Sequence, residues 1–197
     1  MAIAVLFCVI LSEEVQAQGR LFLKATKSNG NVITTGASPN EAPGVVDVGV
    51  GGNPILANYA TLSSAGFDTE KALNIGSPSA GAGAIVFAPL TIAKKGDLSS
   101  ARFFLAQCQG DLMDIEIVTI ALDGSPKRNV AHKIILRNAA VKAFSTDLVE
   151  DCSCQVEAIS FEYGSLEIYP YTISNAGKFS AGQATGWNRI TNKVINP

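Results

Sequence analysis

His132 is the only histidine among the 197 residues, so it is the only imidazole that could act as a general base or hold a metal ion. The alternation of the surrounding sequence places it on the same side of a predicted strand as Val130, Ile134 and Leu136. No Gly-x-Ser-x-Gly motif, which exposes the nucleophilic serine of many hydrolases, accompanies it. We therefore interpret His132 as a half-buried structural residue rather than a catalytic one.

The cysteines are the second group with potential chemistry. Cys108, Cys152 and Cys154, even when combined with His132, match no known zinc-binding spacing. Cys152 and Cys154 are two apart at the start of a predicted strand, so their side chains should point the same way, about 6 to 7 Å apart, without bridging each other. Two alternatives stay open for the thiols: a disulfide from Cys108 to one of the other two, or three reduced and buried thiols.

Two further stretches resemble parts of enzyme sites without completing them. Asp147, Glu150 and Asp151 cluster near a predicted strand end, where a solvated turn is a better interpretation than a pair of acid–base catalysts. The small-residue run 79–84 lacks the Lys-Ser/Thr pair and the following helix of a phosphate-binding loop. The sequence therefore predicts no catalytic residue, no cofactor site, no metal site and no enzymatic activity.

Composition excludes several classes of protein. Hydrophobic residues make up 47% of the chain and charged residues 16%, compared with about a quarter charged in an average soluble domain. The only long apolar run, residues 2–11, is shorter than the ~20 residues that cross a bilayer, so we expect no membrane insertion. The net charge of −2 argues against a nucleic-acid partner, and the large apolar fraction argues against disorder.

The N-terminal residues have the features of an export signal. The apolar run is followed by a polar step and by Val15 and Ala17, at the positions that a signal peptidase reads. We expect cleavage after Ala17, although no Lys or Arg precedes Arg20; the alternative is a buried first strand or helix. The expected organisation is therefore a signal peptide at residues 1–17 and a single secreted domain at residues 18–197.

Cleavage would change the charge of the chain. It would remove Glu13 and Glu14 and reduce the acidic residues from 17 to 15, equal to the 15 Lys and Arg residues. A surface without net charge neither repels other copies of itself nor attracts a charged ligand from a distance. We therefore expect the mature protein to associate with itself.

The mature chain is predicted to consist of short strands joined by turns. Residues 53–82 are interpreted as a long excursion with little regular structure. About eight strands and one helix indicate a mainly β protein, an antiparallel β-barrel or two-sheet sandwich with one flanking α-helix. The predicted strands are residues 20–25, 45–50, 84–92, 113–121, 130–136, 140–148, 155–161 and 165–171.

One helix is predicted between Asp97, as its N-cap, and Gly110, where it stops. Apolar residues recur along it at intervals of three or four, which predicts that they form its buried face. These residues are Leu98, Ala101, Leu105 and Cys108.

Three stretches resemble the Hcp (haemolysin-coregulated protein) family, the tube-forming proteins of type VI secretion systems. Residues 74–95 are similar to its small-residue linker, strand and Lys-bearing turn, and residues 97–110 to its single helix with a closing Cys and Gly. Residues 186–193, Gly-Trp-Asn-Arg-Ile-Thr-Asn-Lys, resemble its Gly-Trp-Asp-x-x-x-Asn-Lys end, with Asn188 in place of the usual Asp. The order and spacing match, so the resemblance extends over residues 20–195.

The resemblance implies a barrel of two packed sheets with the helix on its flank, six-membered rings that stack into a hollow tube, and no catalysis. It also implies that the partners are other copies of the chain and effector proteins held in the lumen. We expect ring-to-ring contacts in residues 51–83 and the lumen near Glu116 and Lys133. Family members normally lack a cleavable signal, so an exported ring or filament is a second form of this hypothesis.

A secreted β-sandwich that binds carbohydrate or acts as an adhesin is the alternative function. That alternative requires an exposed platform of aromatic side chains. The residues available for it are Trp187, Tyr163, Tyr169 and Tyr171.

Overall fold

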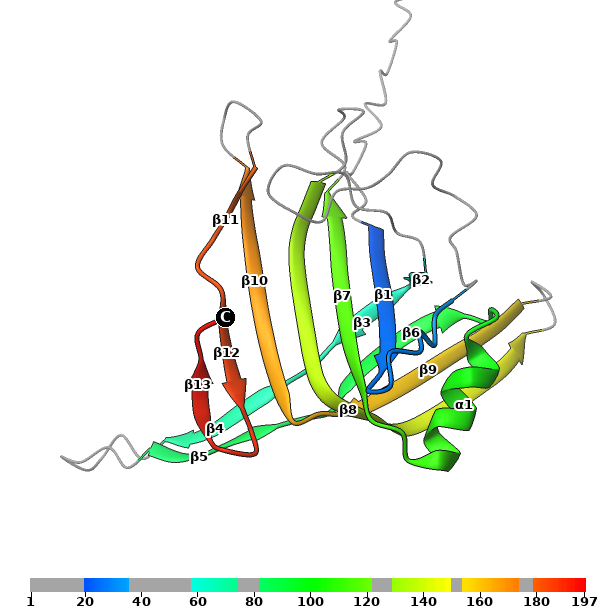
Figure 1. Ribbon diagram of the computed structural model, residues 1–197, viewed down its shortest axis with the longest axis horizontal. Coiled ribbons are helices and arrows are strands. Elements are labelled where there is room, and N and C mark those ends of the chain that lie inside the picture. Colours follow the sequence, from blue (N-terminus) through cyan, green and yellow to red (C-terminus); the bar gives the residue numbers. More distant parts are fainter. Residues whose placement is uncertain (1–19, 36–57, 74–81, 122–128, 150–153, 174–178) are drawn as a thin grey trace, which may run out of the picture.

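The computed structural model describes residues 20–35, 58–73, 82–121, 129–149, 154–173 and 179–197 (Figure 1). The predicted signal peptide, the predicted strand at 45–50, Glu150, Asp151 and Cys152 lie outside these residues. The elements are β1 (Arg20–Lys27), β2 (Ala60–Leu62), β3 (Ser64–Gly66), β4 (Thr69–Leu73), β5 (Ala82–Phe87), β6 (Leu90–Lys95), α1 (Ser100–Gln109), β7 (Met113–Ala121), β8 (Asn129–Val149), β9 (Cys154–Glu162), β10 (Ser165–Ile173), β11 (Phe179–Ala181), β12 (Thr185–Asn188) and β13 (Lys193–Ile195).

These elements confirm a mainly β, antiparallel, two-sheet fold with one flanking helix. The first sheet has the strand order β13-β12-β10-β8-β7-β1-β2, and the second is formed by β3, β6, β9 and the end of β8. Strand β8 belongs to both sheets, because it pairs with β7 and β10 up to Ala139 and with β9 from Ala140 onward. Figure 1 shows its sharp bend at the bottom of the molecule.

The bend in β8 explains an error of sequence interpretation. Residues 130–136 and 140–148 are predicted as two strands but form one strand of 21 residues. Asn138 adopts a left-handed backbone conformation, with φ of 50°, between the two halves. Asn tolerates this conformation better than most residues, so the chain turns the corner without a loop.

The described residues form two sheets that share strand β8, and they do not form a closed barrel. The barrel alternative is therefore not observed. The chain leaves the first sheet after β2 and enters the second as β3, and the backbone N–H of Ser63, between these strands, donates to the Ala93 carbonyl of β6 at 2.7 Å. In addition, β10, β12 and β13 extend the first sheet beyond the second, and only the separate β4–β5 hairpin lies beside them at the lower left of Figure 1.

The main core lies between the two sheets. Leu23 of β1, Ile115 of β7 and Leu136 of β8 face Ile92 of β6 and Ile159 of β9, and all five are fully buried. The alternation of residues along β1, β7, β9 and β10 is therefore the alternation between this core and the opposite faces of the sheets.

The opposite face of the first sheet carries a second, smaller buried cluster that includes Phe22, Val118 and Val130. The β7–β8 pairing contains a register shift. Thr119 and Ile120 are adjacent on β7, but their partners on β8, His132 and Val130, are two positions apart. This bulge moves Val130 to the opposite side of the sheet from Ile134 and Leu136. The prediction that His132 shares a side with Val130 is therefore wrong.

The helix is present, but the prediction of its buried face is wrong. Phe103 and Ala106 are the residues that α1 buries, and the ring of Phe103 packs edge to face on Phe161 with centroids 5.9 Å apart. The predicted face is exposed to solvent: Leu98 is 68% and Leu105 50% exposed. The predicted end is confirmed, because Gly110 takes the left-handed conformation, with φ of 67°, that closes the helix.

The start of the helix also differs from the prediction. Ser99, not Asp97, is the N-cap residue. One carboxylate oxygen of Asp97 accepts hydrogen bonds from the backbone N–H and the hydroxyl of Ser99, so Asp97 stabilises the turn before the helix.

The segment 53–82 is more regular than predicted. Its described part contains β2, β3 and β4, and β4 pairs with β5 as a separate two-stranded hairpin. The run predicted as one strand over residues 84–92 is two strands, because Pro89 and its neighbour separate β5 from β6. Three short C-terminal strands, β11 to β13, were not predicted from the sequence.

Candidate assembly surfaces

The structure places His132 within strand β8 of the first sheet. This residue is half-buried in β8, between Thr119 of β7 and Pro170 of β10. Among the described residues, no three His, Cys, Asp or Glu side chains are grouped so that they could hold a metal ion. No helix in the same part of the chain is long and apolar enough to cross a membrane.

The other residues considered from the sequence are also scattered. Cys108 is an exposed free thiol on α1, which contradicts the alternative in which it is buried. Asp147 is an exposed residue of β8. The end of the small-residue run 79–84 enters strand β5, whereas a phosphate-binding loop would be followed by a helix.

The aromatic residues do not form a platform. Tyr163 is 2% exposed, and its hydroxyl donates a hydrogen bond to the Ala88 carbonyl. Trp187 lies opposite Leu166, on the core side of the first sheet. Tyr169 and Tyr171 alternate with the core residues of β10 and therefore lie on the other side. The carbohydrate-binding alternative loses the surface on which it depends.

A ladder of polar side chains crosses the non-core face of the first sheet. Arg137 of β8 lies between two carboxylates, 2.7 Å from Asp114 of β7 and 3.3 Å from Glu167 of β10. Tyr169 donates a 2.7 Å hydrogen bond to Glu167, and the Lys133 ammonium lies 4.5 Å from the Tyr169 ring centroid. Burial, together with the bond to Glu167, raises the pKa of Tyr169 to about 12. These contacts tie three neighbouring strands together.

The same face carries the two residues near which the lumen is expected from the sequence. Glu116 and Lys133 do lie on one face, but Glu116 accepts a 2.8 Å hydrogen bond from the hydroxyl of buried Tyr59. Burial, followed by the charge of Glu116, raises the pKa of Tyr59 well above its ordinary value. Phe22 and Val118 beside them are also buried. Because a channel wall must be exposed, we consider the outer face of the second sheet a better candidate for the lumen.

The outer face of the second sheet is open and lined by small side chains. Two rows of residues cross its four strands in register, and none of their side chains is larger than that of threonine. The rows are Ser64, Ala93, Ala158 and Ser145, and Gly66, Thr91, Ser160 and Ala143. Four of the eight residues are Ala or Gly and the other four carry a hydroxyl, so both rows are uncharged; the next row on this face contains Lys95, Val156 and Asp147.

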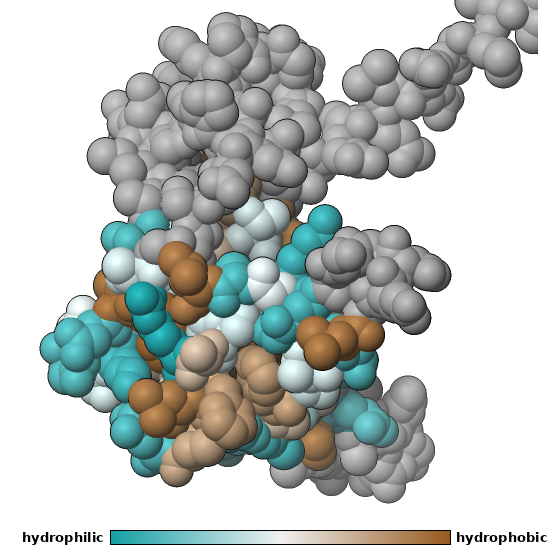
Figure 2. Space-filling view, turned by 90° about the vertical axis from the view of Figure 1, so that its right-hand side faces the viewer, coloured by the Kyte–Doolittle hydropathy of each residue, from teal (hydrophilic) through white to brown (hydrophobic). Residues whose placement is uncertain are grey.

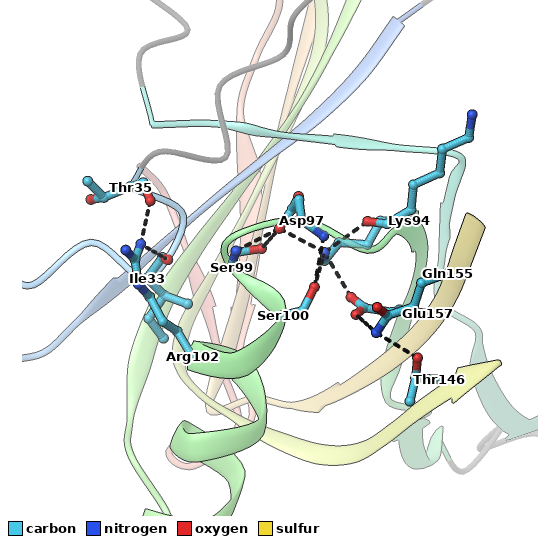
Figure 3. A network of polar contacts seen from close by, with 11 residues as sticks. Ile33, Thr35, Lys94, Asp97, Ser99, Ser100, Arg102, Thr146, Gln155 and Glu157 are labelled. Atoms are coloured by element: carbon cyan, nitrogen blue, oxygen red, sulfur yellow. Dashed lines mark hydrogen bonds and ion pairs between the residues drawn. The ribbon is translucent and has the colours of Figure 1, made fainter. Parts of the chain in front are cut away.

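A buried ion pair attaches the start of α1 to the second sheet (Figure 3). Lys94 and Glu157 lie opposite each other on β6 and β9, both fully buried, with Nζ and Oε2 2.8 Å apart. The same ammonium is 3.0 Å from Asp97 and donates to the Ser100 hydroxyl at 3.2 Å. Gln155 donates to the second Glu157 oxygen at 2.8 Å. The network positions α1 on the edge of the sandwich.

Arg189 attaches the C-terminal hairpin. Its guanidinium donates to the Tyr163 carbonyl at 2.7 Å, lies 2.6 Å from Glu162, and stacks 4.6 Å from the Tyr163 ring centroid and 5.5 Å from that of Phe87. Gly186 of β12 passes so close to β10 that a Cβ there would lie 2.7 Å from the Leu166 carbonyl oxygen. The β12–β13 hairpin is therefore held tightly against β10 and β5.

An apolar groove of about 280 Å³ opens between this hairpin and the β4–β5 hairpin. It exists because the first sheet extends beyond the second, so the core side of β10 and β12 is left partly uncovered. The indole nitrogen of Trp187 is buried beside it without a hydrogen-bond partner. The lining residues are Phe67, Thr69, Ile85, Phe87, Leu166, Ile168, Thr185, Gly186 and Trp187.

The ion pair of Arg189 makes the attachment of the C-terminal hairpin sensitive to acid. Partial burial alone would raise the pKa of Glu162, but its hydrogen bonds with Arg189 and Lys142 hold that pKa below the ordinary 4.5. A carboxyl group whose pKa is lowered in the folded protein stabilises the fold at pH values above its ordinary pKa. This stabilisation is lost as the pH falls through the lowered pKa of the folded protein. We expect the fluorescence of Trp187, the only tryptophan, to change as the pH falls below 4.5, the ordinary pKa of this carboxyl group.

The Arg189→Met variant should lose most of this acid-induced change, because its hairpin already lacks the ion pair at neutral pH. Fluorescence titration of both proteins measures the effect. Lys142→Met is the matched control: it removes the longer, 3.3 Å bond to Glu162 and should keep the change. Superimposable titrations of wild type and Arg189→Met would contradict the assignment.

Comparison with protein families identifies the chain. Residues 58–169, more than half of its 197 residues, match the family model described as "Type VI secretion system effector, Hcp". The chain belongs to the Hcp family. The matched region runs from β2 into β10 and so contains α1, the Lys94 network and all of the second sheet. The C-terminal hairpin, whose sequence also resembles Hcp proteins, lies beyond it.

Solved structures support the Hcp fold at low sequence identity. A type VI secretion system protein superposes with a TM-score of 0.72 at 15% identity, covering 90% of this chain and 100% of its own. Hcp1 from Salmonella typhimurium gives 0.60 at 13% identity, with 89% and 99% covered. The secreted protein Hcp3 from Pseudomonas aeruginosa gives 0.55 at 16%, with 84% and 97% covered. A search of curated proteins found no match.

Proposed function

We propose that this protein is a non-enzymatic structural subunit that assembles into rings, with six copies expected, which stack into a hollow tube of a type VI secretion system or of a related exported filament. Membership of the Hcp family is the observation that carries this proposal. The fold supports it, because the chain covers the whole of a type VI secretion system protein of known structure. The partners would be other copies of the chain, with effector proteins inside the tube.

We place the lumen wall on the outer face of the second sheet. A channel that passes folded or partly folded cargo is best lined by small, uncharged side chains, because these neither narrow it nor hold charged cargo. The two rows of small residues across β3, β6, β9 and β8 have this character, and most of them are exposed. The polar ladder of the first sheet would then stabilise each subunit rather than contact cargo.

We also keep the proposal that residues 1–17 are a cleaved export signal and that residues 18–197 form one secreted domain. Its support is the apolar run followed by small residues at the expected cleavage site. The mass of the protein recovered from the culture medium tests it. A mature chain that begins at Gln18 is expected, and a recovered chain that retains residues 1–17 would contradict it.

Native mass spectrometry of the purified protein tests the assembly. We expect a discrete oligomer whose mass is a fixed multiple of the subunit mass over a range of concentrations, because a closed ring has a defined number of copies. A protein that stays monomeric at the highest concentration measured would overturn the proposed function.

A further inference from the structure

Large exposed apolar side chains are segregated to two opposite sides of the molecule. Of the nine such residues in the described part of the chain, five lie on or next to α1, three lie on β5 or the β12–β13 hairpin, and only Val156 lies elsewhere. The first group is Leu98, Phe104, Leu105, Leu112 and Leu148, and the second is Val86, Ile190 and Val194. Figure 1 shows α1 and the end of β8 on the right and β5, β12 and β13 on the left.

The helix is apolar on both of its sides. Phe103 and Ala106 face the core, whereas the stripe of apolar residues predicted from periodicity points to solvent. The one charged residue of α1, Arg102, donates hydrogen bonds to the backbone carbonyls of Ile33 and Thr35. Figure 2 looks onto this side of the molecule, where brown and tan side chains gather in the lower half. Large apolar side chains gathered on an exposed face usually mark a surface that another molecule covers.

The opposite side carries a complementary shape. The groove between the β4–β5 and β12–β13 hairpins is lined by three aromatic and several aliphatic side chains. Ile190 and Val194 are exposed on the hairpin that forms one of its walls. The unpaired indole N–H of Trp187 lies at the same place. The chain therefore presents protruding apolar side chains on one side and an apolar hollow on the other.

We propose that the outward face of α1 in one copy packs against the groove side of the next copy, with Phe104 and Leu105 directed toward the groove. The inference rests on the proposed ring assembly and names the two surfaces that would meet within a ring. Because the surfaces differ and lie on opposite sides, the contact is heterologous, and its repetition produces a closed ring or an open filament. A symmetric contact of helix on helix would leave the groove uncovered.

Two charge substitutions, one on each side, test this contact. Leu105→Asp spoils the helix side and Ile190→Asp the groove side, and both residues are at least half exposed in the subunit. Each variant alone should become monomeric by native mass spectrometry while keeping the wild-type circular dichroism spectrum and melting temperature of the monomer. Val156→Asp is the control: Val156 is an apolar residue that is 41% exposed and lies outside both surfaces, so this variant should assemble as the wild type does.

Mixing the two variants distinguishes a heterologous contact from a symmetric one. The Ile190→Asp copy keeps an intact helix side and the Leu105→Asp copy an intact groove side, so together they should form a one-to-one dimer and nothing larger. The fluorescence of Trp187 in the Leu105→Asp copy should shift to shorter wavelength on mixing, because its groove becomes covered.

Two results would overturn the inference while leaving the proposed function standing. The first is a Leu105→Asp variant that assembles like the wild type. The second is a mixture that stays monomeric, which would mean that the helix side meets another surface or a different partner. A wild-type protein that never assembles would instead refute the proposed function, so the two failures are distinguishable.

Discussion

Replacing Lys94 by Met is expected to destabilise the subunit by about 3 to 5 kcal/mol, the usual effect of removing one partner of a buried ion pair. Lys94 and Glu157 are both fully buried, and their charged atoms are 2.8 Å apart. Without the ammonium, the Glu157 carboxylate stays in the core with the Gln155 amide as its one hydrogen-bond partner among the described residues. Urea unfolding of the monomer, followed by circular dichroism, measures the loss.

Two comparisons make this result specific. Lys142→Met removes an exposed partner of Glu162, 3.3 Å away, and should cost less than about 1 kcal/mol, as surface pairs do. Replacing Lys94 and Glu157 together by Met should recover much of the stability lost in the single variant, because no unpaired charge remains. A Lys94→Met protein as stable as the Lys142→Met protein would show that the ion pair is not buried.

The second large effect is expected at Phe103, which is fully buried and packs on Phe161. Phe103→Ala should destabilise the monomer by about 3 to 5 kcal/mol, the sum of the lost apolar burial and the cavity left behind. Phe104→Ala is the matched control, the same change one residue along the helix. Its side chain is 55% exposed, so we expect a loss below about 1 kcal/mol in monomer stability.

The pair of variants also separates folding from assembly. Phe104→Ala should weaken the oligomer, because it removes a side chain from the proposed contact, while leaving the monomer stable. Thermal unfolding under dissociating conditions and native mass spectrometry measure the two quantities. Equal destabilisation of the monomer by both substitutions would contradict the orientation of α1 described above.

The strands that could be predicted are those with one face in the core. In β1, β7 and β10 the alternation of apolar residues follows the burial of Leu23, Ile115 and Leu166, so sequence and structure agree. β2 and β3 could not be predicted in the same way, because strands of three residues are too short to show a period. The two halves of β8 look like separate strands in the sequence, because a bend within one strand at Asn138 and a turn between two strands both interrupt the run of apolar residues.

Periodicity identified the helix but not its orientation. The apolar positions from Leu98 to Cys108 form a real stripe, and so do Phe103 and Ala106, but spacing alone does not say which stripe faces the core. The mistaken prediction is informative, because the residues that looked like the core side of α1 are those expected to be covered by another copy.

The candidate surfaces themselves could not be predicted from local sequence. Lys94 and Glu157 meet only because β6 and β9 pair in register, and the groove combines β4 and β5 with β10 and β12, about a hundred residues further along the chain. Contacts between such distant segments depend on topology, which composition and periodicity do not specify. The resemblance to Hcp proteins supplied the two packed sheets and the flanking helix but not the strand order, and the match over residues 58–169 confirms the family.

Electron cryomicroscopy of the purified wild-type protein tests the central claim most directly. The proposed function predicts closed rings with a central channel that the second sheet of every subunit faces, and the further inference predicts that each α1 lies against the β12–β13 hairpin of the next copy. Monomers, or dimers related by a two-fold axis with α1 packed on α1, would contradict it.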